Sequence, residues 1–146
     1  MRCTAFVRAM DAADLGAAQG LMAQLSYEIS ADDLAARFKA VSGDPDHVMF
    51  VAEQGGLTLG LVHVFIRKAL EKPVEAVVQS LVVDVRARGT GMGRLLMDKA
   101  EAWARGKGVA SVALHTTLTR ADARAFYARL GYAEAVQSAL LRKKLA

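Results

Sequence analysis

This chain of 146 residues contains little cysteine, proline or aromatic residue: it has one cysteine, two prolines and 6% aromatic residues. Because Cys3 is the only cysteine, no disulfide can form within the chain, and such cysteine usage is typical of a cytoplasmic protein. No apolar run approaches the roughly 18 to 20 residues that a membrane-spanning helix needs, so we expect no membrane partner. The first six residues carry one arginine and no long apolar stretch, and we therefore expect no secretory signal.

Repeats, low-complexity tracts and linkers rich in proline, glycine or serine are also missing, so we expect a single domain over residues 1–146. The formal net charge is +4, but the only basic cluster is Arg142-Lys143-Lys144, and nucleic-acid recognition motifs are absent. We expect no nucleic-acid partner; the charge indicates a solvated basic face or arginines around a polyphosphate ligand. No residue set has metal-ligand spacing, so we expect no metal, and we interpret His47 and His63 as structural.

Hydrophobic residues make up 53% of the chain and charged residues 23%, which is typical of a folded domain with its own core. In chain order the patterns predict a strand at 4–8, helices from Asp11 or Asp14 and from Ser30, strands at 47–53, 57–66 and 75–84, a helix at 91–107, a strand at 109–116, a helix at 119–130, and one or two strands within 132–145. The order β-α-α-β-β-β-α-β-α-β describes an α/β domain with a mixed sheet flanked by helices.

The most informative segment runs from Leu81 to Leu96, where a buried strand ends in a glycine-rich turn and a long helix begins. The first N–H groups of a helix have no intrahelical partner, and the helix dipole adds positive charge there. Glycines let a phosphate approach these donors closely. The residues of this turn are Arg88, Gly89, Thr90, Gly91, Met92, Gly93 and Arg94. They predict an anion site, most naturally for a pyrophosphate.

Two common phosphate motifs do not fit this turn. A Walker loop ends in Gly-Lys-Ser/Thr, whereas the chain has Gly93-Arg94-Leu95. The dinucleotide motif G-x-G-x-x-G differs from the G-x-G-x-G found here. An ordinary tight corner between strand and helix would also use glycines. The segment resembles the R/Q-x-x-G-x-G/A signature of the GNAT superfamily of acetyltransferases, and after one further strand Ala123 to Tyr132 resembles its second signature, A-x-x-F-Y-x-x-x-G-F/Y.

The resemblance covers nearly the whole chain and implies the GNAT fold, in which two neighbouring strands splay apart and the pantetheine arm of acetyl-CoA enters the gap. Its amides are then expected to pair with backbone at Leu81, Val82 and Val83, and its pyrophosphate to lie on the turn from Arg88 to Arg94. The implied activity is acetyl-CoA-dependent transfer of an acetyl group to a primary amine, on a small molecule or a peptide. Relatives are often dimers, so a homodimer is a further expectation.

By this resemblance, Tyr127 holds the position of the tyrosine that protonates the leaving thiolate, although a tyrosine there can also merely pack. Many relatives have a glutamate at the position of Gln79, which cannot take a proton. His115 can act as the base, since histidine titrates near neutral pH, but it can equally be bound to backbone. Glu75 is a weaker candidate, and a water chain would need no base. Arg120 replaces a frequent asparagine and either reaches a cofactor phosphate or faces solvent.

The acceptor amine is expected near the first two helices. Tyr27 and Glu28, with Asp32 and Asp33, form an acidic and aromatic patch that suits a cationic amine, or else simply place acids at a helix N-terminus. The alternative from another class is a non-catalytic acyl-CoA-binding or regulatory module of the same fold. Gln79 and the missing asparagine favour that alternative, because the chemistry then lacks its usual groups.

Overall fold

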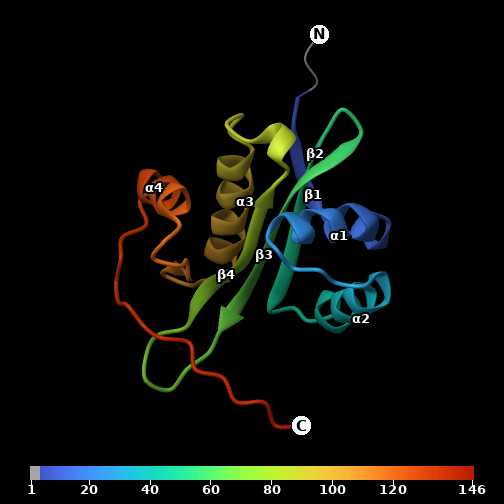
Figure 1. The fold of residues 1–146 in the computed structure, drawn as a ribbon. Coiled ribbons are helices and arrows are strands. Elements are labelled where there is room, and N and C mark those ends of the chain that lie inside the picture. Colours follow the sequence, from blue (N-terminus) through green and yellow to red (C-terminus); the bar gives the residue numbers. More distant parts are fainter. Residues whose placement is uncertain (1–3) are drawn as a thin grey trace. The chain divides into compact units, whose positions relative to one another are not determined.

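Five strands form one mixed sheet in the order β1-β2-β3-β4-β5 (Figure 1). The structure is a computed structural model that describes residues 4–146, and Cys3 lies outside the described residues. The strands are β1 (Phe6–Ala9), β2 (His47–Gln54), β3 (Leu57–Arg67), β4 (Glu75–Val83) and β5 (Val112–Leu114). The first three pairings are antiparallel, and β5 runs parallel to β4. The predicted α/β fold with a mixed sheet is therefore confirmed.

The helices begin at the capping residues that the sequence indicates. They are η1 (Ala12–Asp14), α1 (Leu15–Gln24), α2 (Ala31–Ser42), η2 (Val85–Ala87), α3 (Met92–Gly106) and α4 (Ala121–Arg129), where η marks a single 3-10 turn. The Asp11 carboxylate accepts a hydrogen bond from the Ala13 N–H at 2.9 Å and begins η1. The Ser30 hydroxyl accepts from the Asp33 N–H at 3.1 Å, so it satisfies one of the first N–H groups of α2.

The chain packs as two compact units, one ending at His115 and the other formed by Thr116–Ala146. The first unit contains the whole sheet with α1, α2 and α3. The second unit contains α4 and the segment that follows it.

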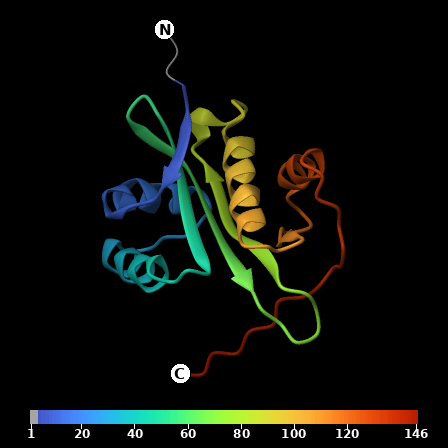
Figure 2. The ribbon, with the colours of Figure 1, turned by 180° about the vertical axis from the view of Figure 1, so that it is seen from behind.

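In the first unit, helices cover both faces of the sheet (Figures 1 and 2). Leu61 of β3 packs in a core cluster with Ala18 and Leu21 of α1, so this side chain points to the face that α1 covers. The neighbouring residue, Gly60, points to the opposite face, where a Cβ atom would lie 2.8 Å from Leu96 Cδ1 of α3. Glycine at this position therefore lets α3 pack directly against the sheet.

A partly buried ion pair joins β1 to the 3-10 turn η1, which directly precedes α1. The Arg8 guanidinium donates to both carboxylate oxygens of Asp14, at 2.9 and 2.8 Å, and its Nε donates to Glu53 at 3.1 Å. Thr58 adds a fourth contact, donating to Asp14 at 3.1 Å. The hydrogen bonds from Arg8 hold the pKa of the Asp14 carboxyl below its usual range, so this buried group stays ionised and paired.

Two predicted strands differ from the structure. β5 spans only Val112–Leu114, shorter than the predicted 109–116, because its pairing with β4 stops at Val78. The strands predicted within 132–145 were wrong: residues 133–146 form no strand. A strand requires a hydrogen-bonded neighbour, and alternating apolar residues do not supply one. The apolar side chains of that segment are exposed, with Val136 at 78% and Leu141 at 88%.

His47 and His63 lie on the paired strands β2 and β3 and contact each other. His47 Nδ1 lies 2.9 Å from His63 Nε2, so one ring donates and the other accepts. The ring of His47 also stacks on Phe65. Burial, together with the neighbouring His47, lowers the pKa of His63 from 6.5 to about 4. The His63 ring is therefore stable in its neutral form, as expected for a structural contact.

This lowered pKa predicts a loss of stability in mild acid. Between pH 6.5 and 4 the unfolded chain protonates at this position while the folded chain does not, so protons favour unfolding. From pH 7 to pH 5 we expect this residue alone to remove about 1–2 kcal/mol from the free energy of unfolding, measured by urea denaturation. The His63→Gln variant should lose correspondingly less over the same interval. An identical pH dependence in both proteins would contradict this assignment.

Candidate active site

The turn between β4 and α3 leads the chain through two left-handed glycines. Gly89 has φ +76° and Gly91, the N-cap of α3, has φ +89°, a conformation that favours glycine. A Cβ atom built at either position would meet nothing within 4 Å, so the space beside this backbone is open. The first N–H groups of α3 have no helical partner, and Arg88 and Arg94 are exposed nearby. The turn has the backbone and charge that an anion site needs.

The carboxylate of Asp84 holds the start of this turn. It is only 7% exposed and accepts from the Arg86 N–H at 2.9 Å, which begins η2. The Arg86 guanidinium donates to both carboxylate oxygens, at 3.0 and 3.1 Å. These bonds hold the pKa of Asp84 far below its usual range, so the carboxylate is ionised at neutral pH.

Gln24, the last residue of α1, binds the same turn. Its Nε2 donates to Asp84 Oδ2 at 3.2 Å, and its Oε1 accepts from the Val85 N–H at 3.0 Å. Sequence reasoning missed this residue, because nothing in a linear pattern relates a helix end to a turn 60 positions later. The last residue of α1 is thus bonded directly to the start of the glycine turn.

Beyond a bulge, β4 presents backbone at an edge that no strand of the described residues covers. Val78 pairs with Val64 and Ser80 with His63, so Gln79 is the extra residue of the bulge. The Asp84 N–H donates to Leu59 of β3 at 2.7 Å. Since neighbouring strand residues face opposite edges, the Val82 backbone also faces β3. The backbone groups of Leu81 and Val83 face the other edge, where the Val83 carbonyl accepts from Arg88 Nε at 3.2 Å.

The two strands β4 and β5 part directly after their last pair, Val78 with Leu114. Gln79 and His115 are the next residues on each strand, so the structure brings these two sequence-predicted positions to the same point. Both side chains are exposed. Glu75 lies at the other end of β4, where its carboxylate accepts from the Arg67 guanidinium and from the Ser111 hydroxyl. It therefore forms a structural contact away from the parting point.

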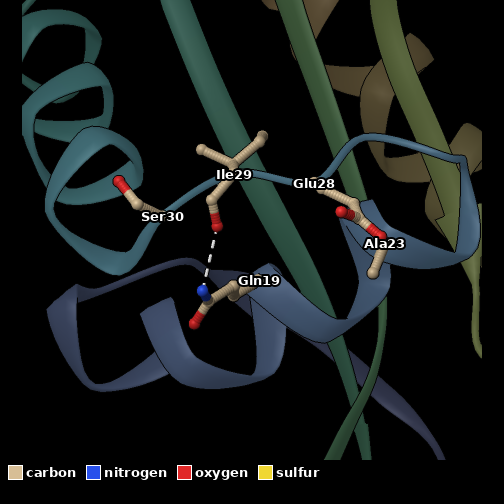
Figure 3. Close-up of a pocket in the computed structure, with 5 residues that line it drawn as sticks. All are labelled: Gln19, Ala23, Glu28, Ile29 and Ser30. Carbon is tan, nitrogen blue, oxygen red and sulfur yellow. Dashed lines mark hydrogen bonds between the residues drawn. The ribbon is translucent and has the colours of Figure 1, made fainter.

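A pocket of about 380 Å³ opens beside the end of α1 (Figure 3). Its lining residues are Gln19, Ala23, Glu28, Ile29 and Ser30. Gln19 donates from Nε2 to the Ile29 carbonyl at 2.9 Å and fixes one wall. Glu28 supplies the only carboxylate among the lining residues. A carboxylate is the group that the acceptor site predicted from the sequence needs to bind a cationic amine. Tyr27 does not line the pocket and is 59% exposed, so the structure brings only one of the two predicted acceptor residues to it.

In the second unit, Tyr127 lies on α4 between two aromatic rings. It meets Phe126 and Tyr132 edge to face, with ring centroids 5.2 and 5.9 Å apart. Burial raises the pKa of the half-buried Tyr127 hydroxyl, while the positive charge of Arg120 opposes that shift. The hydroxyl therefore stays protonated at neutral pH and can donate a proton. Arg120 is exposed at the N-cap of α4 and makes no capping bond with its side chain.

Within residues 4–146, no group of three or more histidine, cysteine or carboxylate side chains could hold a metal ion. In the same part of the chain, no helix is long and apolar enough to cross a membrane.

The sequence of this chain matches a known family. The model of the acetyltransferase (GNAT) family matches residues 16–132. The chain is 27% identical over 124 residues to the uncharacterized N-acetyltransferase YhdJ of Bacillus subtilis (strain 168), covering 84% of this chain and 86% of that protein.

Among solved structures, the aminoglycoside N-acetyltransferase AAC(6')-Iy in complex with CoA superposes with a TM-score of 0.90 at 20% identity, over 99% of this chain and 97% of that one. The same enzyme with the bisubstrate analog CoA-S-monomethyl-acetylneamine gives a TM-score of 0.87 at 20% identity, over 97% and 99%. These likenesses show the fold, and the family match covers most of the sequence. The chain belongs to the acetyltransferase (GNAT) family.

Proposed function

We propose that this chain is an acetyl-CoA-dependent N-acetyltransferase that works as a single cytoplasmic domain over residues 1–146 and acts on a small-molecule or peptide primary amine. The observation that carries the proposal is the left-handed turn at Gly89 and Gly91, which leaves open space beside the first N–H groups of α3. The uncovered edge of β4 lies next to that turn in the sequence, as a long ligand with a phosphate end and an amide-bearing arm requires. A homodimer is a further proposal, checked by light scattering.

The cofactor residues follow from this edge and this turn. The backbone groups of Leu81 and Val83 would bind the pantetheine amides. Val82, which pairs with Leu61 of β3, would hold this part of β4 in place. The first N–H groups of α3, at Met92 and Gly93, would bind the pyrophosphate, with Thr90 holding the turn through its bond to the Ala87 carbonyl. The exposed cations of this turn that would add charge there are Arg88 and Arg94. For Arg120, exposed at the N-cap of α4, the contact with the cofactor is proposed from the family resemblance alone.

The chemistry is aminolysis of a thioester. The neutral amine nitrogen attacks the acetyl carbonyl carbon, the carbon–sulfur bond breaks, and the acetyl group remains on nitrogen as an amide. The proton lost by the amine passes to a base, and the departing thiolate takes a proton. We assign the first role to His115, beside the parting of β4 and β5, and the second to the Tyr127 hydroxyl.

Glu28 would bind the positive charge of a polyamine or aminoglycoside-like acceptor, because its carboxylate lines the pocket at the end of α1. Tyr27, exposed next to it, would add an apolar contact. Two solved structures of similar fold bear on this choice: both are of an aminoglycoside N-acetyltransferase, and one holds an acetylneamine analog.

A second candidate is a non-catalytic acyl-CoA-binding module. Gln79 favours it, because the bulge of β4 carries an amide that cannot accept a proton. The two candidates differ in turnover and not in cofactor binding.

Free-thiol release from acetyl-CoA, followed with a thiol reagent, tests the function. The panel contains polyamines, aminoglycosides, amino acids and peptides with free N-termini, and calorimetric titration of CoA runs alongside. We expect amine-dependent release, greatest for acceptors with several positive charges and reduced for those acceptors in Glu28→Gln. Binding of CoA without release from any amine would favour the non-catalytic module. Absence of CoA binding would overturn the whole proposal.

The Gly91→Val variant should lose CoA binding. A branched side chain at φ +89° strains the N-cap of α3 and fills the space that the phosphate would enter. We expect the calorimetric dissociation constant to rise roughly tenfold or more, with a smaller rise for Gly91→Ala. The control is Gly106→Val at the opposite end of α3, where a Cβ also meets nothing. Unchanged affinity in a folded Gly91→Val protein would refute the pyrophosphate assignment.

The Tyr127→Phe variant tests the proton donor. Removal of the hydroxyl should lower kcat at least roughly tenfold, because the thiolate then departs without its proton. The dissociation constant of CoA should change less than about twofold, since the ring and its edge-to-face contacts remain. Tyr132→Phe, which removes a hydroxyl from the neighbouring ring, serves as the control. Full turnover in Tyr127→Phe would exclude its role as the acid.

The His115→Ala variant tests the base. If the amine proton passes to this imidazole, its removal should change the shape of the dependence of kcat/KM on pH. We expect kcat to fall at pH 7 and the remaining activity to rise with hydroxide concentration. A pH profile of unchanged shape would exclude His115 and leave a water chain as the proton acceptor.

A further inference from the structure

Gln24 stands between the two binding elements of the first unit. On one side it makes two hydrogen bonds to the start of the glycine turn, at 3.2 Å to Asp84 and 3.0 Å from the Val85 N–H. On the other side, the residue before it, Ala23, lines the pocket beside Glu28. The side-chain amide of Gln24 therefore binds the glycine turn to the end of α1, and the same helix end lines the pocket.

The orientation of this amide is fixed by its partners. The Val85 N–H needs an acceptor and the ionised Asp84 carboxylate needs a donor, so only one of the two amide orientations satisfies both. A glutamate, a methionine or a flipped amide would each lose at least one bond. Gln24 itself is exposed, so its bonds are not required to satisfy a buried group on α1.

The chain changes direction directly after this anchor. Ser26 has φ +71°, a left-handed conformation that is uncommon for a residue other than glycine. The Tyr27 N–H donates back to the Met22 carbonyl at 3.0 Å and closes the end of α1. The next two residues, Glu28 and Ile29, line the pocket. The position of this segment thus depends on where the last turn of α1 is held.

We propose that Gln24 is a positioning residue that couples the cofactor turn to the acceptor pocket, so that occupancy of the turn orders residues 25–30. This inference rests on the proposed function, because it takes the turn as the phosphate site and the pocket as the amine site. Coupling of this kind is reciprocal: a ligand that orders the turn raises affinity at the pocket, and the reverse. Donor binding would then prepare the site for the amine.

Hydrogen exchange with 3'-phospho-ADP, the nucleotide half of CoA, tests the coupling. This probe carries the pyrophosphate and lacks the pantetheine arm. In the wild type we expect it to slow amide exchange both in the turn, residues 85–94, and in residues 25–30. In Gln24→Met, nearly isosteric and without either hydrogen-bonding group, protection of the turn should remain while that of residues 25–30 disappears. Equal protection of residues 25–30 in both proteins would overturn the coupling.

A charge variant gives a readout that a merely structural role would not move. Gln24→Glu keeps an acceptor for the Val85 N–H but sets a carboxylate against Asp84, while Arg86 remains bound to Asp84. At pH 8 the calorimetric dissociation constant for CoA should exceed that of the wild type by about tenfold. The ratio should fall toward one near pH 5.5, because the introduced carboxyl group can donate to Asp84 once it is protonated.

The control for added charge is Ala17→Glu, at an exposed position of the same helix. Its ratio to the wild type should stay near one at every pH. A ratio for Gln24→Glu that does not change with pH would overturn the role of this amide, while normal CoA binding by the wild type leaves the proposed function intact. A wild type that binds neither CoA nor its nucleotide half would overturn both proposals together.

Discussion

The carboxylate of Asp84 is the contact on which the arrangement of the site depends. Asp84 directly follows β4, accepts three bonds from Arg86 and one from Gln24, and lies almost wholly out of solvent. A buried anion is stable only when donors satisfy its oxygens, so the residues around it have few alternative positions. Their common position sets the direction in which the chain leaves the sheet. The left-handed glycines and the first turn of α3 follow from that direction.

The bulge at Gln79 determines which backbone groups of β4 are exposed at the edge of the sheet. One extra residue in β4 changes which backbone groups face β3, so that Leu81 and Val83 face the edge where β5 has already ended. The bulge therefore selects which backbone groups are exposed at this edge, and bulges often lie next to ligand sites. In the neighbouring strand β3, Gly60 lets α3 pack directly against the sheet.

Local signals in the sequence were sufficient for most elements of the fold. The caps at Asp11 and Ser30, the hairpin around Gly55-Gly56 and the helix after Gly91 each depend on residues that are close together in the chain. The length of β5 and the missing C-terminal strand could not be predicted in this way. Both depend on whether a neighbouring strand supplies hydrogen-bonding partners, which is a property of the assembled sheet.

The same limit applies to the candidate site. The glycine turn carries its own signal, because positive φ values and a following helix are local features. The link from Gln24 to Asp84 joins residues 60 positions apart and leaves no mark on periodicity or composition. Glu75 could likewise be assigned a structural role and not that of the base only once its partners Arg67 and Ser111 were known. Residues whose role depends on a distant partner are the ones that sequence reasoning misses.

A crystal structure of the chain with CoA tests the proposed cofactor site most directly. We expect pyrophosphate oxygens within about 2.7–3.2 Å of the first backbone N–H groups of α3, and pantetheine amides bound to the backbone of Leu81 and Val83. A CoA molecule bound with its pyrophosphate away from the Gly89–Gly91 turn, or with its arm away from the edge of β4, would contradict it.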